Sequence, residues 1–147
     1  KVILGSNISF RYKNFYVSIQ MNGAFGHKIF NGTGLSFTSM ACFPDYNVLK
    51  DAPQKNIVDQ RVSDYWLEKG DYLNFEHLTL GYNVPLKSKT LRSLRISGNV
   101  SNLGTITGYG GLTPMINSYV VNSTMGIDDK RTYPVYRTFS LGLSVQF

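Results

Sequence analysis

The stretch RTFSLGLSVQF, residues 137–147, decides the fold, because large apolar and small polar residues alternate along it. Alternation with a period of two is typical of a β-strand with one apolar face and one polar face. The apolar positions are Phe139, Leu141, Leu143, Val145 and the final aromatic residue, Phe147. The positions between them carry only short or polar side chains. The two faces of this strand are therefore expected to meet different surroundings.

Four further segments show the same alternation. Together with the last one, they predict strands near residues 6–13, 15–23, 72–84, 93–103 and 135–147. The polar dipeptide Lys13-Asn14 separates the first two segments, which predicts a β-hairpin. Within residues 72–84 the apolar positions change parity near Glu76 and His77. A β-bulge at this point would restore the register.

The links between these segments differ greatly in length. Residues 13–14 and 85–93 are short links, whereas residues 24–71 and 104–134 are long and rich in Gly, Asn and Pro. Compact soluble domains rarely contain such long connections. Bacterial outer-membrane barrels, in contrast, alternate short periplasmic turns with long extracellular loops. We therefore expect the two long segments to be extracellular loops, and the last strand to end on the periplasmic side.

The composition supports a β-rich membrane protein. Only 16% of the residues are charged, compared with about 25% in soluble domains, while 14% are aromatic. No apolar run approaches the length of about 20 residues that a transmembrane helix needs. Barrel strands leave a weaker trace, because only alternate residues face lipid. About five strands cannot close such a barrel, so we expect the chain to be a fragment.

Several blocks of sequence, taken in order, resemble a known family. The most specific is DYWLEKGDYL at residues 64–73, followed by LTLGYNVP at residues 78–85. Further blocks are LRISGNVSNL at residues 94–103 and LGLSVQF at residues 141–147. In this order, the blocks resemble the C-terminal part of the SusC/RagA family of TonB-dependent outer-membrane transporters of Bacteroidetes.

This resemblance implies an all-β fold, in which the chain supplies the C-terminal strands of a large antiparallel transmembrane β-barrel of the 22-stranded plugged type. A plug domain and a segment that contacts the TonB complex would precede this sequence. The resemblance also implies TonB-coupled import of oligosaccharides or oligopeptides across the bacterial outer membrane, with a SusD-like surface lipoprotein as a lid. The chain departs from the family pattern at residues 74–77 and 110–114, which affects loop and lumen chemistry rather than the fold.

Two sets of residues are candidates for functional roles. The apolar positions of the last strand, ending on Phe147, are typical of a barrel-assembly signal; the alternative is the last strand of a soluble sandwich. Arg11, Arg95 and Asn99 occupy polar positions of their strands, so they are possible lumen-facing residues. The two arginines could meet an anionic or polar substrate, and ion pairing inside the barrel is an equally good explanation.

Aromatic residues near the end of the first long loop allow more than one interpretation. Trp66, with Tyr65 and Tyr72, could form an interfacial girdle or a platform on which a sugar stacks. The favoured interpretation is packing that holds the loop where it re-enters the barrel.

No catalytic, cofactor-binding or metal-binding pattern is present, so the sequence does not predict an enzyme. His27 and His77 are too far apart for a metal-ligand pattern. The pair Asp128-Asp129 is more typical of a solvated loop than of a Ca²⁺ site. The net charge is +6, but the basic residues are scattered, which argues against nucleic-acid binding. A soluble β-sandwich that binds glycans through Tyr-rich loops is the alternative function.

Overall fold

The computed structural model describes residues 1–86, 91–116, 126–130 and 132–147. The described part is mostly β-strand with a few short helices, which confirms the expected all-β class. It divides into two compact units. The first, called here the sheet unit, comprises residues 1–25, 72–106 and 135–147. The second, called the loop unit, comprises residues 26–71 and 107–134.

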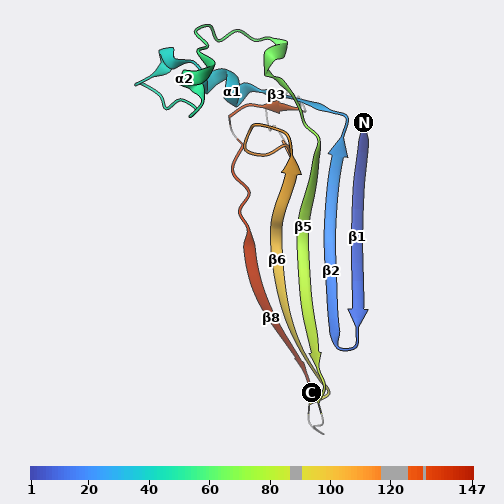
Figure 1. Cartoon of the computed structure of the whole chain (residues 1–147). Coiled ribbons are helices and arrows are strands. Elements are labelled where there is room, and N and C mark those ends of the chain that lie inside the picture. Colours follow the sequence, from blue (N-terminus) through green and yellow to red (C-terminus); the bar gives the residue numbers. More distant parts are fainter. Residues whose placement is uncertain (87–90, 117–125, 131) are drawn as a thin grey trace. The chain divides into compact units, whose positions relative to one another are not determined.

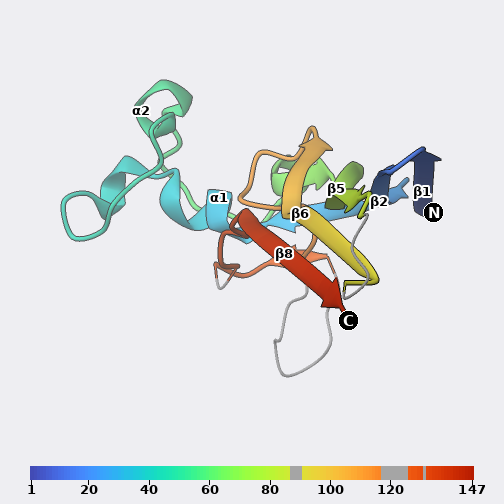
Figure 2. The ribbon, with the colours of Figure 1, turned by 90° about the horizontal axis from the view of Figure 1, so that it is seen from below.

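The sheet unit is one five-stranded sheet with the strand order β1-β2-β5-β6-β8 (Figure 1). Its strands are β1 (Val2–Tyr12), β2 (Phe15–Phe25), β5 (Tyr72–Val84), β6 (Ser93–Thr107) and β8 (Thr138–Gln146). The pairs β1–β2, β2–β5 and β6–β8 are antiparallel. Figure 2 shows the ribbon from below, with β1 and β8 as separate edges of the sheet. The sheet is therefore open.

The hairpin and the bulge expected from the sequence are both confirmed. Tyr12 pairs with Phe15, so Lys13 and Asn14 form a two-residue turn, and Lys13 has a φ of +50°. Along β2 and β5 the register shifts between Gln20 and Met21, and Glu76 is the residue left without a partner. The bulge brings the apolar residues on both sides of it onto one face of the sheet.

β8 begins at Thr138, three residues later than the sequence predicted. The ladder with β6 runs from Ser93–Gln146 to Ser101–Thr138. Asn102 then takes a φ of +54°, which interrupts the ladder. Its side-chain amide donates a hydrogen bond of 3.1 Å to the carbonyl of Tyr136, so a side chain replaces the backbone pairing here. Of the predicted turn at residues 85–93, residues 87–90 lie outside the described part.

The loop unit has secondary structure of its own, although the sequence predicted only loops. A small sheet has the order β4-β3-β7. Its strands are β3 (Lys28–Asn31), β4 (Leu67–Lys69) and β7 (Ile127–Asp128). The helices are α1 (Gly32–Phe37), η1 (Met40–Cys42), α2 (Ala52–Lys55) and η2 (Asp64–Trp66). β3 pairs with β7 across almost a hundred residues, and such a contact leaves no local periodicity in the sequence.

The two units differ in what they bury. Within the described residues, the buried apolar side chains are Ile29, Ala52, Trp66 and Tyr109, and all four belong to the loop unit. The described part of the sheet unit has no buried apolar side chain. None of the helices in the described ranges is long and apolar enough to cross a membrane.

Candidate functional site

One face of the five-stranded sheet is apolar and exposed. Phe10 pairs with Val17 and Val17 with Leu80, so apolar residues continue across neighbouring strands. Between β6 and β8, Ile96 pairs with Leu143. The residues of this apolar face are Val2, Leu4, Ile8, Phe10, Tyr12, Phe15, Val17, Ile19, Met21, Phe75, Leu78, Leu80, Tyr82, Leu94, Ile96, Val100, Phe139, Leu141, Leu143 and Val145. Leu141 is 90% exposed and Phe10 65%, so the described residues leave this face without an apolar covering.

The opposite face is polar, and its side chains bond across the strands. Thr79 donates to Asn99 at 3.0 Å, which joins β5 to β6 and places these two residues on the same face. Further bonds of this polar face are Ser18 to Asn7 at 3.1 Å, Gln20 to Glu76 at 2.9 Å, His77 with Ser101 at 3.1 Å, Arg95 to Asn83 at 2.9 Å and Thr105 to Asn74 at 2.9 Å. Many polar side chains of this face thus bond to one another across the strands, whereas Asn22 Oδ1 is buried without a hydrogen-bond partner in the described residues.

An aromatic ring and two arginines gather on the polar face near the hairpin turn. Tyr16 pairs with Arg11 on one side and with Gly81 on the other. The ring of Tyr16 lies over Gly81, where a β-carbon would come within 1.8 Å of the ring. The guanidinium of Arg95 lies 5.4 Å from the centroid of the same ring, in a cation–π contact.

A hollow of about 410 Å³ adjoins this group. It is lined by Ser9, Phe10, Arg11, Tyr16, Val17 and Ser18. The hydroxyls of Ser9 and Ser18 are 3.1 Å apart. The polar lining consists of hydroxyls, a phenol and a guanidinium, which are hydrogen-bond donors and carry no negative charge.

The residues singled out from the sequence lie on the two faces as follows. Arg11, Arg95 and Asn99 are on the polar face, and no ion pair involves either arginine within the described residues. In the last strand, Phe139, Leu141, Leu143 and Val145 are on the apolar face, and all four are exposed. Phe147 follows the strand and is 77% exposed.

Asp128 is the centre of the loop unit. The carboxylate is 2% exposed and accepts hydrogen bonds of 2.8 Å from both Thr33 Oγ1 and Tyr109 Oη. The amide of Lys130 and the hydroxyl of Thr132 donate further bonds to it. The sequence-based interpretation of Asp128 as part of a solvated loop is therefore wrong, because donors from both long segments enclose this side chain. Its oxygens are engaged by protein donors rather than offered to a cation.

Burial and the hydrogen bond to Asp128 together affect Tyr109. Desolvation is the larger cause, and the carboxylate of Asp128 adds to it; both raise the pKa of the Tyr109 phenol well above its usual range. The phenol therefore remains a hydrogen-bond donor at physiological pH. The sequence gave no signal for this pair, since Tyr109 stands in a Gly-rich stretch that is typical of an open loop.

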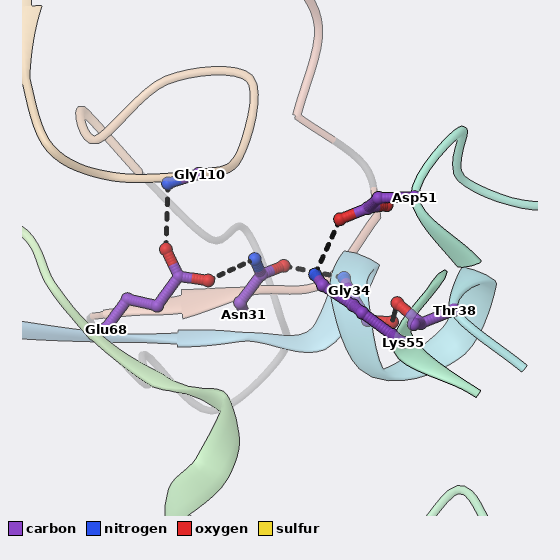
Figure 3. Close-up of polar contacts among 7 residues, drawn as sticks. All are labelled: Asn31, Gly34, Thr38, Asp51, Lys55, Glu68 and Gly110. Carbon is purple, nitrogen blue, oxygen red and sulfur yellow. Dashed lines mark hydrogen bonds and ion pairs between the residues drawn. The ribbon is translucent and has the colours of Figure 1, made fainter. Parts of the chain in front are cut away.

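Glu68 forms a second link between the two long segments (Figure 3). Its carboxylate accepts a hydrogen bond of 2.8 Å from Asn31 Nδ2 and another of 2.8 Å from the amide of Gly110. Asn31 in turn accepts from the amide of Gly34 at 2.6 Å and caps α1. The chain Gly110–Glu68–Asn31–Gly34 thus connects residues that are far apart in the sequence.

A groove of about 530 Å³ lies in the loop unit. Its lining comprises Asn31, Gly34, Leu49, Lys50, Asp51, Gln54, Lys55, Tyr65, Trp66, Glu68 and Gly110. At the rim, Lys55 Nζ lies 2.7 Å from Asp51 Oδ2. The hydrogen bond from Lys55 lowers the pKa of Asp51, and the same contact raises that of Lys55. Both groups are largely exposed, so water screens the pair.

Trp66 lies in the wall of this groove as a packing residue. It is 5% exposed, and its indole N–H donates to the carbonyl of Arg61 at 3.2 Å. Tyr65 packs edge-on against it, with ring centroids 4.9 Å apart, and is itself 62% exposed. The burial of Trp66 agrees with the packing interpretation rather than with a stacking platform.

Comparisons with known proteins agree on one group. TonB-dependent receptor P3 of Formosa agariphila is 29% identical over 161 residues, which cover 98% of the chain. TonB-dependent receptor SusC of Bacteroides thetaiotaomicron is 27% identical over 158 residues, which cover 99%. The chain spans only 16% and 15% of the length of these two relatives. No protein-family model matches the chain.

Comparison with solved structures finds transporters with a similar fold. The RagAB peptide importer in its closed-closed state has a TM-score of 0.76 at 15% identity, over 99% of the chain and 17% of that structure's chain. A structure of the RagAB peptide transporter has a TM-score of 0.74 at 16% identity, over 97% of the chain and 17% of its own.

The fold is thus similar to that of a segment of the barrel-type transporter RagAB. More particularly, the chain is similar over nearly its whole length to TonB-dependent receptors, SusC among them, which confirms the resemblance seen in the sequence.

Proposed function

We propose that the chain forms part of the barrel wall of an outer-membrane importer of nutrient oligomers, either oligosaccharides or oligopeptides. The observation that carries this proposal is the exposed apolar face of the five-stranded sheet. Covering such a face with hydrocarbon removes it from water, and this is favourable by about 25 cal/mol per Å². The opposite, hydrogen-bonded polar face would then line the lumen, with Arg11, Arg95 and Asn99 on it.

The dimensions of the sheet support a membrane-crossing role. Its strands contain between 9 and 15 residues, and a tilted membrane-spanning strand needs about 9–11. The outer edges of β1 and β8 are free within the described residues, and lipid cannot satisfy backbone groups. Neighbouring strands from the remainder of a closed barrel would pair with both edges. A 22-stranded plugged barrel, with this chain as its C-terminal segment, is the proposed whole.

In this proposal, the energy for import and the partner proteins are supplied by components outside this chain. Two relatives are TonB-dependent receptors by name, and two similar structures are of RagAB, a peptide importer. We infer that import is coupled to the TonB complex through a part of the protein outside this sequence. A SusD-like surface lipoprotein would act as the lid. The loop unit, which residues 26–71 and 107–134 form, would lie on the extracellular side and face that lid.

The last strand has a further proposed role in assembly. Phe139, Leu141, Leu143, Val145 and Phe147 would form the alternating apolar signal that barrel-insertion machinery recognises. The other candidate function, a soluble glycan-binding β-sandwich, needs a second sheet packed on the apolar face. In the described residues this face is exposed, which favours the barrel.

The experiment that tests the proposal uses the intact protein in its own bacterium. We expect it in the outer-membrane fraction, soluble only with detergent, and with faster mobility on SDS gels before heating than after. Deletion of the gene should abolish uptake of at least one oligosaccharide or oligopeptide. An intact protein that is soluble without detergent and monomeric would contradict the barrel.

A further inference from the structure

Charge is distributed unequally between the two units. The sheet unit contains eight Lys or Arg residues and one acid, Glu76, whereas the loop unit contains seven basic and eight acidic residues. The net charge of +6 therefore originates in the sheet unit. Glu76 does not compensate it locally, because it accepts a hydrogen bond from Gln20. It also lies about 16 Å along β5 from Gly81, at 3.3 Å per residue.

Two of these cations, Arg11 and Arg95, flank the ring of Tyr16 on the polar face. Arg11 is the cross-strand partner of Tyr16, and the Arg95 guanidinium lies 5.4 Å from the ring centroid. Arg95 donates one hydrogen bond, from Nε to Asn83, and the forked end of its guanidinium has no protein acceptor among the described residues. Arg11 has no hydrogen bond or ion pair there.

A guanidinium offers five N–H donors in a planar fork that matches a carboxylate. Neither guanidinium has a carboxylate partner in the described residues, so both keep donors available for an anion. The hollow beside Arg11 adds the hydroxyls of Ser9 and Ser18. These groups are suited to an oxyanion, and nothing in the lining repels one.

We propose that this part of the polar face binds carboxylates, and that the imported cargo is an acidic oligopeptide. The proposal rests on the proposed function, since it needs the polar face to line the import route. Peptide is favoured over acidic glycan because sugars bind well by stacking on a free aromatic face. The ring of Tyr16 is already covered by Gly81 and Arg95. The other aromatic residue of the lining, Phe10, belongs to the apolar face, so the described lining offers no free aromatic face on the polar side.

Binding to the purified intact protein tests the proposal by calorimetry. The probes are a peptide of alternating Gly and Glu, the matched peptide of Gly and Gln, and trigalacturonate. In the native protein we expect the Glu peptide to bind about tenfold more tightly than the Gln peptide, as for one or two charged hydrogen bonds. The double variant Arg11→Gln/Arg95→Gln should lose this preference. Lys13→Gln removes one positive charge at the turn, away from the hollow, and should keep it.

Equal binding of the two peptides, or a preference that survives in the double variant, would overturn the proposal. If the two peptides bind equally and the double variant is also less stable to heat, the two arginines form ion pairs with a carboxylate of the protein itself. Tighter binding of trigalacturonate than of the Glu peptide would overturn the peptide assignment. Uptake measured in cells separates this inference from the proposed import function. Import without a preference for acidic peptides contradicts only the inference. A lack of import of any oligomer contradicts both.

Discussion

The ring of Tyr16 on β2 lies directly over the α-carbon of Gly81 on β5, where a β-carbon would come within 1.8 Å of the ring. The two residues are cross-strand partners, and only glycine leaves the space that this ring position requires. We predict that Gly81→Ala displaces the ring and with it the Arg95 contact, at a cost of about 1–3 kcal/mol, as in other overpacked sites. The yield of heat-modifiable barrel on SDS gels measures the effect.

Two variants make this prediction specific. Gly5→Ala is the control, since a β-carbon at Gly5 would meet nothing within 4 Å, and it should assemble normally. Tyr16→Ala in the Gly81→Ala background should restore assembly, because it removes the clashing ring. A barrel that tolerates Gly81→Ala alone as well as Gly5→Ala would show that the close approach is unimportant.

Asp128 should hold the two long segments of the loop unit together. Replacement by Ala leaves the donors of Thr33 and Tyr109 unsatisfied, and each buried unsatisfied group costs about 1–3 kcal/mol. We predict about 2–3 kcal/mol less local stability, which corresponds to roughly 30- to 150-fold faster amide hydrogen exchange in β3 and β7. Asp45→Ala, at an exposed position, should leave exchange unchanged. Equal exchange in the two variants would refute the role of Asp128.

The Tyr109 phenol should make the loop unit sensitive to alkali. Its pKa in the folded state is raised, chiefly by burial, from an ordinary value of 10.0. The stabilising contribution is therefore complete below pH 10 and is lost as the pH rises above it, where the unfolded chain ionises first. In Tyr109→Phe this dependence should be absent. Proteolysis rates of the loop unit measured between about pH 9 and 11 check it, and identical slopes in the two proteins would be the contrary result.

The sheet could be predicted from the sequence because its signals are local. Alternation with a period of two marks the strands, and the parity change near Glu76 marks the bulge, without knowledge of any partner. The loop unit could not be predicted in this way. Its folded structure depends on contacts such as Thr33–Asp128, between residues 95 positions apart. In the sequence, an acidic residue that is buried by such distant donors cannot be distinguished from an exposed acidic residue of a loop. For the same reason, the sequence placed Asp128 in solvent.

For the candidate lumen residues, too, the sequence predicted the local feature but not the long-range contacts. Arg11, Arg95 and Asn99 were assigned to the polar face by parity, and the structure places them there. The contacts of the Tyr16 ring with Gly81 and Arg95 could not be predicted from the sequence, because they depend on how three strands are aligned. Parity fixes the face of a residue but not its neighbours across the sheet.

The central claim is that the apolar face of the sheet contacts lipid. Spin labels placed one at a time at residues 139–144 of β8, in the intact protein with Cys42 replaced by Ser and reconstituted in vesicles, test it most directly. Collision with oxygen, which dissolves in lipid, should be high for labels replacing Phe139, Leu141 and Leu143, and low for those replacing Ser140, Gly142 and Ser144. Collision with a water-soluble nickel complex should not be high at the first three positions. Labels on the apolar face that are as accessible to nickel as those on the polar face would contradict the claim.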